Sequence, residues 1–192
     1  DITQSVAAMI SEQLGTNVQI MDEITIKGVH VSKKTETLTT ESLLAKLRDS
    51  VAYNIEAYAI AVNGNVVATL KNKDEANEVL EYLNQMYTPE GAENVKISYE
   101  EDVQIVSQYT NQDSIMSLED AKNKIALGQS VTKTHTVASG EAAYSIAAKY
   151  GMTLEELYEL NPSMNSSPNI YVGQELTVKA NEPYITVKAT VT

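Results

Sequence analysis

The chain has 192 residues, 43% of them hydrophobic, which is enough for buried cores in one large or two small domains. Its formal charge of −12 argues against binding to nucleic acid, anionic membranes or teichoic polymers, because these partners are themselves negatively charged. The absence of cysteine excludes disulfides and thiolate zinc sites, and no apolar run is long enough to insert into a membrane.

The first quarter of the chain predicts a helix, a long strand and a second helix. The first helix starts near Thr3, a candidate N-cap, and ends at Gly15. Residues 17–31 then alternate apolar and polar side chains, with a bulge or bend at 21–23. A helix follows from Thr39 or Thr40. The apolar faces of the two helices consist of Val6, Ile10 and Leu14, and of Leu43, Leu44, Leu47 and Val51.

Residues 57–70 predict a β-hairpin. Two alternating segments flank Asn63-Gly64, the dipeptide that best tolerates positive φ at both positions of a tight turn. One face of this hairpin carries only small side chains, so a helix can lie close to it. The small residues are Ala57, Ala59, Ala61 and Ala68.

The order helix, strand, helix returns after the hairpin. Asn72 and Glu75 have the spacing of a capping box for a helix that extends to Tyr87. A second long strand is predicted over 94–106, and Ser117 begins a helix that ends at Gly128. Residues 3–51 and 72–127 therefore look like two copies of one unit, and 1–131 is expected to form one α+β domain whose role the sequence does not indicate.

If the first unit is a true copy, it should also follow a hairpin. That hairpin would lie upstream of Asp1, and the chain would be a piece of a longer protein. The strand that starts at Val18 would then have an unpaired edge. We expect this edge either to pair with a neighbouring copy of the chain, which would give strand-mediated self-association, or to be covered by the Ala57–Leu70 hairpin.

Residues 133–179 predict a second domain with the order strand, helix, helix, strand. A strand over 134–137 leads into a turn at Ser139-Gly140. One helix runs over 143–150 and ends at Gly151, and another begins with the capping box of Thr153 and Glu156 and stops before Pro162. A strand over 175–178 closes the domain.

These elements, in this order, resemble the LysM module, a small βααβ domain that binds peptidoglycan and chitin. The resemblance implies a non-catalytic site for N-acetylglucosamine glycans in a shallow groove between the first strand–helix loop and the loop after the second helix. Backbone amides there would meet the acetamido group, and apolar side chains would meet its methyl group and the sugar ring. The implied groove residues are Ser139, Gly140, Glu141, Ala142, Ala143 and Tyr144 on one side, and Asn161, Pro162, Ser163, Met164, Asn165 and Ile170 on the other.

The first loop departs from the family pattern at one place. The family usually has Asp-Thr-Leu after the glycine, whereas this chain has Glu141, Ala142 and Ala143, and so lacks a hydroxyl and a large apolar contact. An alternative is therefore a module that is kept as a spacer and no longer binds sugar. We expect Asn161 and Met164 to support binding without being needed for folding.

The flanks of this module resemble those in secreted clostridial-type wall proteins. There, LysM precedes a five-glycine β module and a lysostaphin-like zinc endopeptidase, and residues 180–192 look like the start of such a β module or a linker. The resemblance implies a secreted, peptidoglycan-binding segment of a Gram-positive cell-wall hydrolase, an endopeptidase or amidase whose zinc would lie in a downstream domain. No cofactor is expected in this chain. An alternative is a structural spore-coat or cell-surface protein placed by its LysM.

The chain itself is not expected to be an enzyme. Its histidines, His30 and His135, fall in predicted strands and outside any zinc-hydrolase motif, so no metal site is predicted. The acidic run 100–102 fits a solvated strand edge better than a calcium site. A hydrolase with an acid pair that carries no motif stays open as an alternative. The Asn165–Ser167 glycosylation sequon is interpreted as accidental in a bacterial protein.

Overall fold

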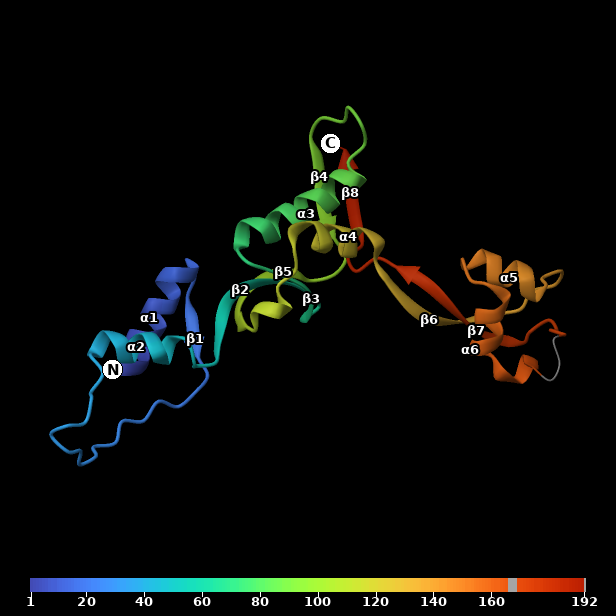
Figure 1. Cartoon of the computed structure of the whole chain (residues 1–192). Coiled ribbons are helices and arrows are strands. Elements are labelled where there is room, and N and C mark those ends of the chain that lie inside the picture. Colours follow the sequence, from blue (N-terminus) through green and yellow to red (C-terminus); the bar gives the residue numbers. More distant parts are fainter. Residues whose placement is uncertain (166–168, 192) are drawn as a thin grey trace. The chain divides into compact units, whose positions relative to one another are not determined.

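The computed structural model describes residues 1–165 and 169–191, without the side chain of Asn165, and the sequon at 165–167 lies largely outside this range. The chain divides into two compact units, Asp1–Lys122 with Val187–Thr192, and Asn123–Thr186 (Figure 1). Both units mix helices with antiparallel strands, which confirms the predicted α+β class. The division falls inside a helix, earlier than the predicted boundary at 131–133.

A four-stranded sheet forms the centre of the first unit. Strand β2 (Tyr53–Val62) pairs with β5 (Val103–Thr110) along one edge, and its other edge is shared by β3 (Asn65–Leu70) and the short β1 (Val18–Ile20). Asn63 and Gly64 between β2 and β3 both have positive φ, 50° and 80°, which confirms the predicted hairpin.

Four helices accompany these strands: α1 (Ile2–Leu14), α2 (Thr40–Arg48), α3 (Lys73–Tyr87) and α4 (Leu118–Leu127). A short 3₁₀ helix, η1 (Gln112–Ser114), follows β5. Helix α3 packs against the hairpin strands, and the small residues Ala57 and Ala59 are fully buried, as expected for a closely packed helix. Thr39 and Ser117 cap α2 and α4 through the amides of Ser42 and Asp120.

Two of the predicted caps differ in the structure. Asp1, not Thr3, caps α1, because its carboxylate accepts a hydrogen bond from the Thr3 amide at 3.0 Å. Asn72 caps α3 through the Glu75 amide as predicted, but the Glu75 side chain forms an ion pair with Lys71 at 2.7 Å instead of completing a capping box.

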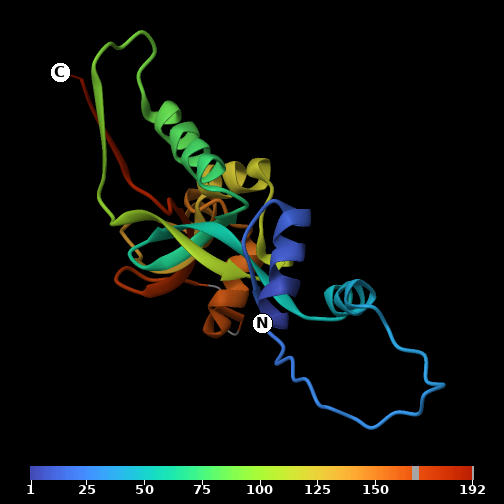
Figure 2. The same ribbon diagram turned by 90° about the vertical axis from the view of Figure 1, so that its left-hand side faces the viewer.

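The two predicted long strands are also shorter in the structure. The segment over 94–106 is interrupted at Glu100–Asp102 and gives β4 (Val95–Tyr99) and β5, because the tip of the hairpin fixes the break: the Asp102 amide donates to Asn63 Oδ1 at 2.9 Å, and the Asn63 amide to Asp102 O at 2.8 Å. The segment over 17–31 keeps only β1, whose residues pair with Tyr53–Ile55 at the start of β2. Residues 21–39 form a long loop that leaves the rest of the unit (Figures 1 and 2).

The last strand, β8 (Val187–Val191), pairs antiparallel with β4, from Val95 opposite Val191 to Tyr99 opposite Val187. Residues 180–182 belong to the preceding strand β7 of the second unit. Most of residues 180–191 are therefore strand residues. That they open a five-glycine module stays a prediction.

Removal of residues 187–192 should expose β4. Its amides lose the five-residue ladder with β8, so hydrogen exchange at Val95–Tyr99 is expected to accelerate at least about tenfold, the effect of about 1.4 kcal/mol of lost protection. Exchange along β6, in the other unit, serves as the internal control. Unchanged exchange at Val95–Tyr99 would contradict a structural role for β8.

The second unit contains β6 (Gln129–Thr136), α5 (Ala143–Lys149), α6 (Leu154–Leu160), the 3₁₀ helix η2 (Pro162–Asn165) and β7 (Glu175–Glu182). Strands β6 and β7 pair along their whole length, and both are longer than predicted. Thr153 and Glu156 make the predicted capping box, with hydrogen bonds of 3.1 and 2.8 Å. The βααβ order of this domain is therefore confirmed.

Candidate glycan-binding site

Two loops of the second unit are anchored on a single hydrophobic core. The loop between β6 and α5 ends at Ala143, and the stretch after α6 contains Met164 and Ile170, all of which pack against this core. The Val137 amide donates to Gln174 O at 2.8 Å, and the Gly173 amide donates to Val137 O at 2.8 Å, which ties the two stretches together. The fully or nearly buried members are Val137, Ile146, Ala147, Met152, Leu157, Met164, Leu176 and Val178.

The first loop is a tight turn closed by Glu141. The Glu141 amide donates to Ala138 O at 3.2 Å, and Gly140 has the positive φ, 86°, that a central turn position of this kind requires. The Glu141 carboxylate folds back over the turn, where Oε2 accepts from the Ala138 amide at 2.8 Å and lies 2.7 Å from His135 Nε2.

A hydrogen-bonded chain of side chains continues behind this turn. Because an ionised carboxylate only accepts hydrogen bonds, Nε2 of His135 carries the hydrogen towards Glu141. The other ring nitrogen, Nδ1, lies 3.0 Å from the Tyr150 hydroxyl. His135 is 8% exposed, so the chain of three side chains links β6, the turn and the end of α5 beneath the surface.

The pKa of Glu141 is lowered, first by the hydrogen bond from the Ala138 amide and then by that from His135, with Lys149 Nζ adding a positive charge 3.6 Å from Oε1. From the sequence, Glu141 is a predicted groove residue and a departure from the family pattern, but its bonds to Ala138 and His135 were not predicted. The available signal was the Ser139-Gly140 turn, which reverses the chain and brings residue 141 back to residue 135.

The loop after α6 differs from the expected groove wall. Asn161 is 8% exposed, and both ends of its amide are hydrogen-bonded inside the domain: Nδ2 donates to Leu157 O at 2.8 Å and to Thr177 O at 2.7 Å, while Oδ1 accepts from the Thr177 amide at 2.8 Å. Met164 is 2% exposed in the core. Their burial and internal bonds leave these two side chains little surface to offer a sugar, and they give both side chains a part in the packing of the domain that the sequence did not indicate.

Other predicted groove residues are accessible. Ser139 and Gly140 in the first loop, Tyr144 at the start of α5, and Pro162 and Ser163 in η2 are exposed, with Tyr144 at 71%. Three further first-loop residues and Ile170 are half-buried, and the side chain of Asn165 lies outside the described residues. The half-buried first-loop residues are Glu141, Ala142 and Ala143.

Replacement of Glu141 with glutamine should destabilise the second unit in a pH-dependent way. A lowered pKa in the folded state means that Glu141 stabilises the fold fully above its ordinary pKa of about 4.3, and that this contribution disappears as pH falls through the folded value. At pH 7 the variant should therefore melt at a lower temperature than the parent chain, and the difference should close towards pH 2. Thermal unfolding followed by circular dichroism measures both.

Glu159, exposed on α6, provides the control for this substitution. Glu159→Gln should leave the melting temperature nearly unchanged at either pH, because surface carboxylates without fixed partners contribute little. A Glu141→Gln variant whose melting temperature matches that of Glu159→Gln at pH 7 would contradict the stabilising role of the turn cluster.

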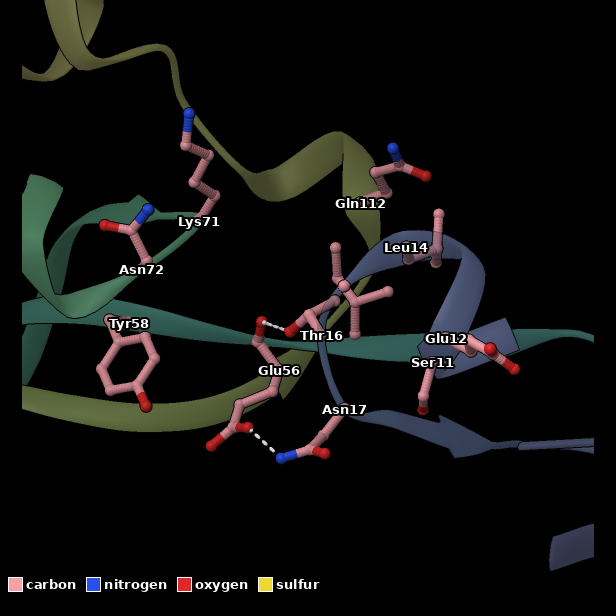
Figure 3. A pocket seen from close by; sticks show the side chains of 12 residues that line it. Ser11, Glu12, Leu14, Thr16, Asn17, Glu56, Tyr58, Lys71, Asn72 and Gln112 are labelled. Atoms are coloured by element: carbon pink, nitrogen blue, oxygen red, sulfur yellow. Dashed lines mark hydrogen bonds between the residues drawn. The ribbon is translucent and has the colours of Figure 1, made fainter. Parts of the chain in front are cut away.

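The first unit has an open cleft of about 680 Å³ next to the turn after α1 (Figure 3). Two carboxylates line it, Glu12 and Glu56, but both oxygens of Glu56 already accept hydrogen bonds, from Asn17 Nδ2 at 2.6 Å and Ser107 Oγ at 2.8 Å. Thr16 Oγ1 also donates to the Glu56 carbonyl at 3.2 Å. These bonds join the α1–β1 turn to β2 and β5, which is a structural role for Glu56.

Within residues 1–165 and 169–191, no group of three or more His, Asp or Glu side chains is placed to hold a metal ion. His30 lies exposed in the 21–39 loop and His135 is buried in the turn cluster, so the two histidines have different surroundings. None of the described helices is long and apolar enough to span a bilayer.

Comparisons with known proteins agree with this geometry. The family model of the LysM domain matches residues 135–179. Over 58 residues the chain is 38% identical to the probable endopeptidase p60 of Listeria monocytogenes, covering 30% of this chain and 12% of that protein. Over 60 residues it is 42% identical to a chlorophenol reductase of Desulfitobacterium hafniense, covering 31% and 17%. No solved structure matches the chain. The chain thus spans only a small part of these relatives' length, and its residues 135–179 are a LysM domain.

Proposed function

We propose that this chain holds a larger cell-wall protein on peptidoglycan through its LysM domain. The observation that carries the proposal is the pair of loops anchored on one core. Ser139 and Gly140 of the first loop, with Tyr144 at the start of α5, are exposed, and so are Pro162 and Ser163 after α6. Backbone N–H and C=O groups of such loops suit the acetamido group of N-acetylglucosamine, and Tyr144 offers an aromatic face to a sugar ring.

The cluster around Glu141 supports binding at this place despite the missing Asp-Thr-Leu sequence. Glu141 fixes the turn through the Ala138 amide and His135, so the backbone of the first loop is held in one conformation before a glycan arrives. Preorganised groups lose little entropy on binding. Because a shallow groove covers little of a glycan, we expect weak binding by one domain and retention by several contacts together.

The larger protein is proposed to be a secreted hydrolase of a Gram-positive cell wall, with a zinc endopeptidase or amidase domain outside this chain. Two observations support this: the resemblance of the flanking sequences, and the match to a protein described as a probable endopeptidase. The zinc would belong to that other domain.

Cosedimentation with purified peptidoglycan tests the binding proposal. The full chain should pellet with the insoluble polymer, and Tyr144→Ala should weaken its apparent affinity about threefold to tenfold, equivalent to about 0.5–1.5 kcal/mol. Tyr109→Ala, an exposed tyrosine of the first unit, is the matched control and should pellet like the parent. A full chain that stays in the supernatant would establish the spacer alternative.

A second assay separates binding from hydrolysis. Release of reducing ends from the same peptidoglycan is expected to equal the no-protein blank for the full chain. Release above the blank that disappears in Glu56→Gln would overturn the structural role assigned to Glu56 and favour an acid-pair hydrolase in the first unit.

A further inference from the structure

The loop between β1 and α2 contains a segment whose sequence is typical of a half-buried strand but whose side chains face solvent. Ile24 and Ile26 alternate with polar residues, and after Lys27 and Gly28 the alternation resumes one position out of phase at Val29 and Val31. Ile24 is half-buried, yet Ile26 is 78%, Val29 75% and Val31 56% exposed. Both views show the loop apart from the other elements of its unit (Figures 1 and 2). In the part of the chain that the structure describes, no strand pairs with this segment.

The second copy of the same unit shows where such a segment lies when it is folded. In both copies a helix that buries two apolar residues four positions apart is followed by a short strand that starts with valine. The helix that ends each copy is capped alike, by a hydroxyl that accepts from the amide three residues on. The corresponding apolar positions are Val6, Ile10, Val18, Ile20, Ile24 and Ile26, and Val79, Leu83, Val95, Ile97, Val103 and Ile105.

In this correspondence the 24–31 segment is the counterpart of strand β5. Strand β5 pairs antiparallel with β2 over eight residue pairs, from Ile55 opposite Thr110 to Val62 opposite Val103. Its aliphatic side chains Val103, Ile105 and Val106 are half-buried there. The hairpin that provides β2 leads directly, through Lys71 and Asn72, into α3, the counterpart of α1.

The hairpin of this chain is already engaged. One edge of β2 carries β5, and the other carries β3 and β1, so β2 has no free edge for the 24–31 segment. The partner must therefore provide a further strand edge.

We propose that residues 24–31 form an acceptor strand, and that its partner is a further β-hairpin with the pattern of Tyr58–Leu70, two alternating apolar strands joined by a tight turn. Pairing is antiparallel, as between β2 and β5, with main-chain hydrogen bonds for affinity and the apolar face of Ile24 and Ile26 buried against the hairpin. The loop then becomes the outer strand of a second sheet beside α1.

A chain that carries a second copy of residues 53–73 directly before Asp1 tests this proposal. Asp1 corresponds to Asp74, so the added hairpin enters α1 as β2 and β3 enter α3. Amide hydrogen exchange by NMR should slow at least about tenfold at alternate residues of 24–31, and the same amides should exchange as unstructured chain in the parent. Unchanged protection of β2 and β5 shows that the rest of the unit is folded.

The control is the same fusion with Ile60→Asp and Val62→Asp in the added hairpin only. It has the same length but places charges on the strand meant to pair, so residues 24–31 should exchange as fast as in the parent. A complementary variant keeps the added hairpin unchanged and replaces Ile26 with Asp in the loop. It should also abolish the protection of the amides at 24–31. Equal exchange at 24–31 in the two fusions overturns the proposal, whereas protection only in the unmodified fusion establishes it. Peptidoglycan binding is independent of this readout.

Discussion

Replacement of Asn161 with alanine is expected to cost the LysM domain about 2–4 kcal/mol of unfolding free energy. The side chain makes the two hydrogen bonds that a neighbouring strand would otherwise make with Thr177. It donates to Thr177 O and accepts from the Thr177 amide on the edge of β7 that faces away from β6. Alanine would leave both backbone groups without partners where water has little access. Because a domain of about 60 residues is stable by roughly 3–9 kcal/mol, much of its stability would be lost.

Urea unfolding of the full chain, with exchange of LysM amides as the local probe, measures this loss. Asn161→Asp keeps the acceptor for the Thr177 amide but places a carboxylate oxygen against the carbonyl oxygens of Leu157 and Thr177, so at pH 7 it should be at least as destabilising as Asn161→Ala. Asn169→Ala, an exposed asparagine of the following loop, should change unfolding by less than about 0.5 kcal/mol. An Asn161→Ala chain as stable as Asn169→Ala would contradict the expectation that the bonds from Asn161 to Thr177 of β7 stabilise the domain.

Asn161 also illustrates what the sequence could not reveal. Its position after a helix and before Pro162 correctly predicted the end of α6, because the signals that end helices are local. Whether its amide faced a sugar or the backbone of Thr177 depended on a residue 16 positions away. The same holds for Met164, which lies in a loop by sequence and in the core by packing.

Elements defined by neighbouring residues were predicted well. The Asn63-Gly64 hairpin, the Thr153 capping box and the left-handed glycines at Gly15 and Gly151 are all confirmed, because each depends on a few consecutive residues. Strand pairing was not foreseen where it joins distant segments. Nothing in the sequence of Val95–Tyr99 or of Val187–Val191 indicates that these two segments pair, so their hydrogen-bond ladder is known only from the structure.

The predicted long strand over 17–31 failed for a related reason. An alternating sequence specifies a face, but a strand also needs a neighbour for its backbone groups. Val18–Ile20 pair with β2, but among the described residues no strand lies beside 24–31, so the pattern persists while the strand does not form. Residues 103–110, which also carry alternating apolar residues, do form a strand, β5, because β2 lies beside them.

Replacement of Gly128 with alanine is expected to be more damaging than the same change at any other glycine in the LysM unit. Gly128 ends α4 with a φ of 72°, and an added Cβ would overlap the carbonyl oxygen of Glu182 and come within 2.9 Å of its carbonyl carbon. These are backbone atoms at the end of the β6–β7 ladder, so they cannot rotate away as a side chain can. Left-handed strain and the overlap together should cost about 2–5 kcal/mol.

Gly173 separates these two contributions. It has a similar φ of 86°, but an added Cβ would meet no atom within 4 Å, so Gly173→Ala should cost only the backbone strain, about 1–2 kcal/mol. Thermal unfolding of the two variants, with exchange at Gln129 and Glu182 as the local probe, measures the difference. Equal losses of stability in the two variants would mean that the backbone at Glu182 shifts away from the added Cβ at little cost. A larger loss at Gly128, with faster exchange at the Gln129–Glu182 end of the β6–β7 ladder, would show that the close approach between the end of α4 and β7 stabilises this end of the strand pair.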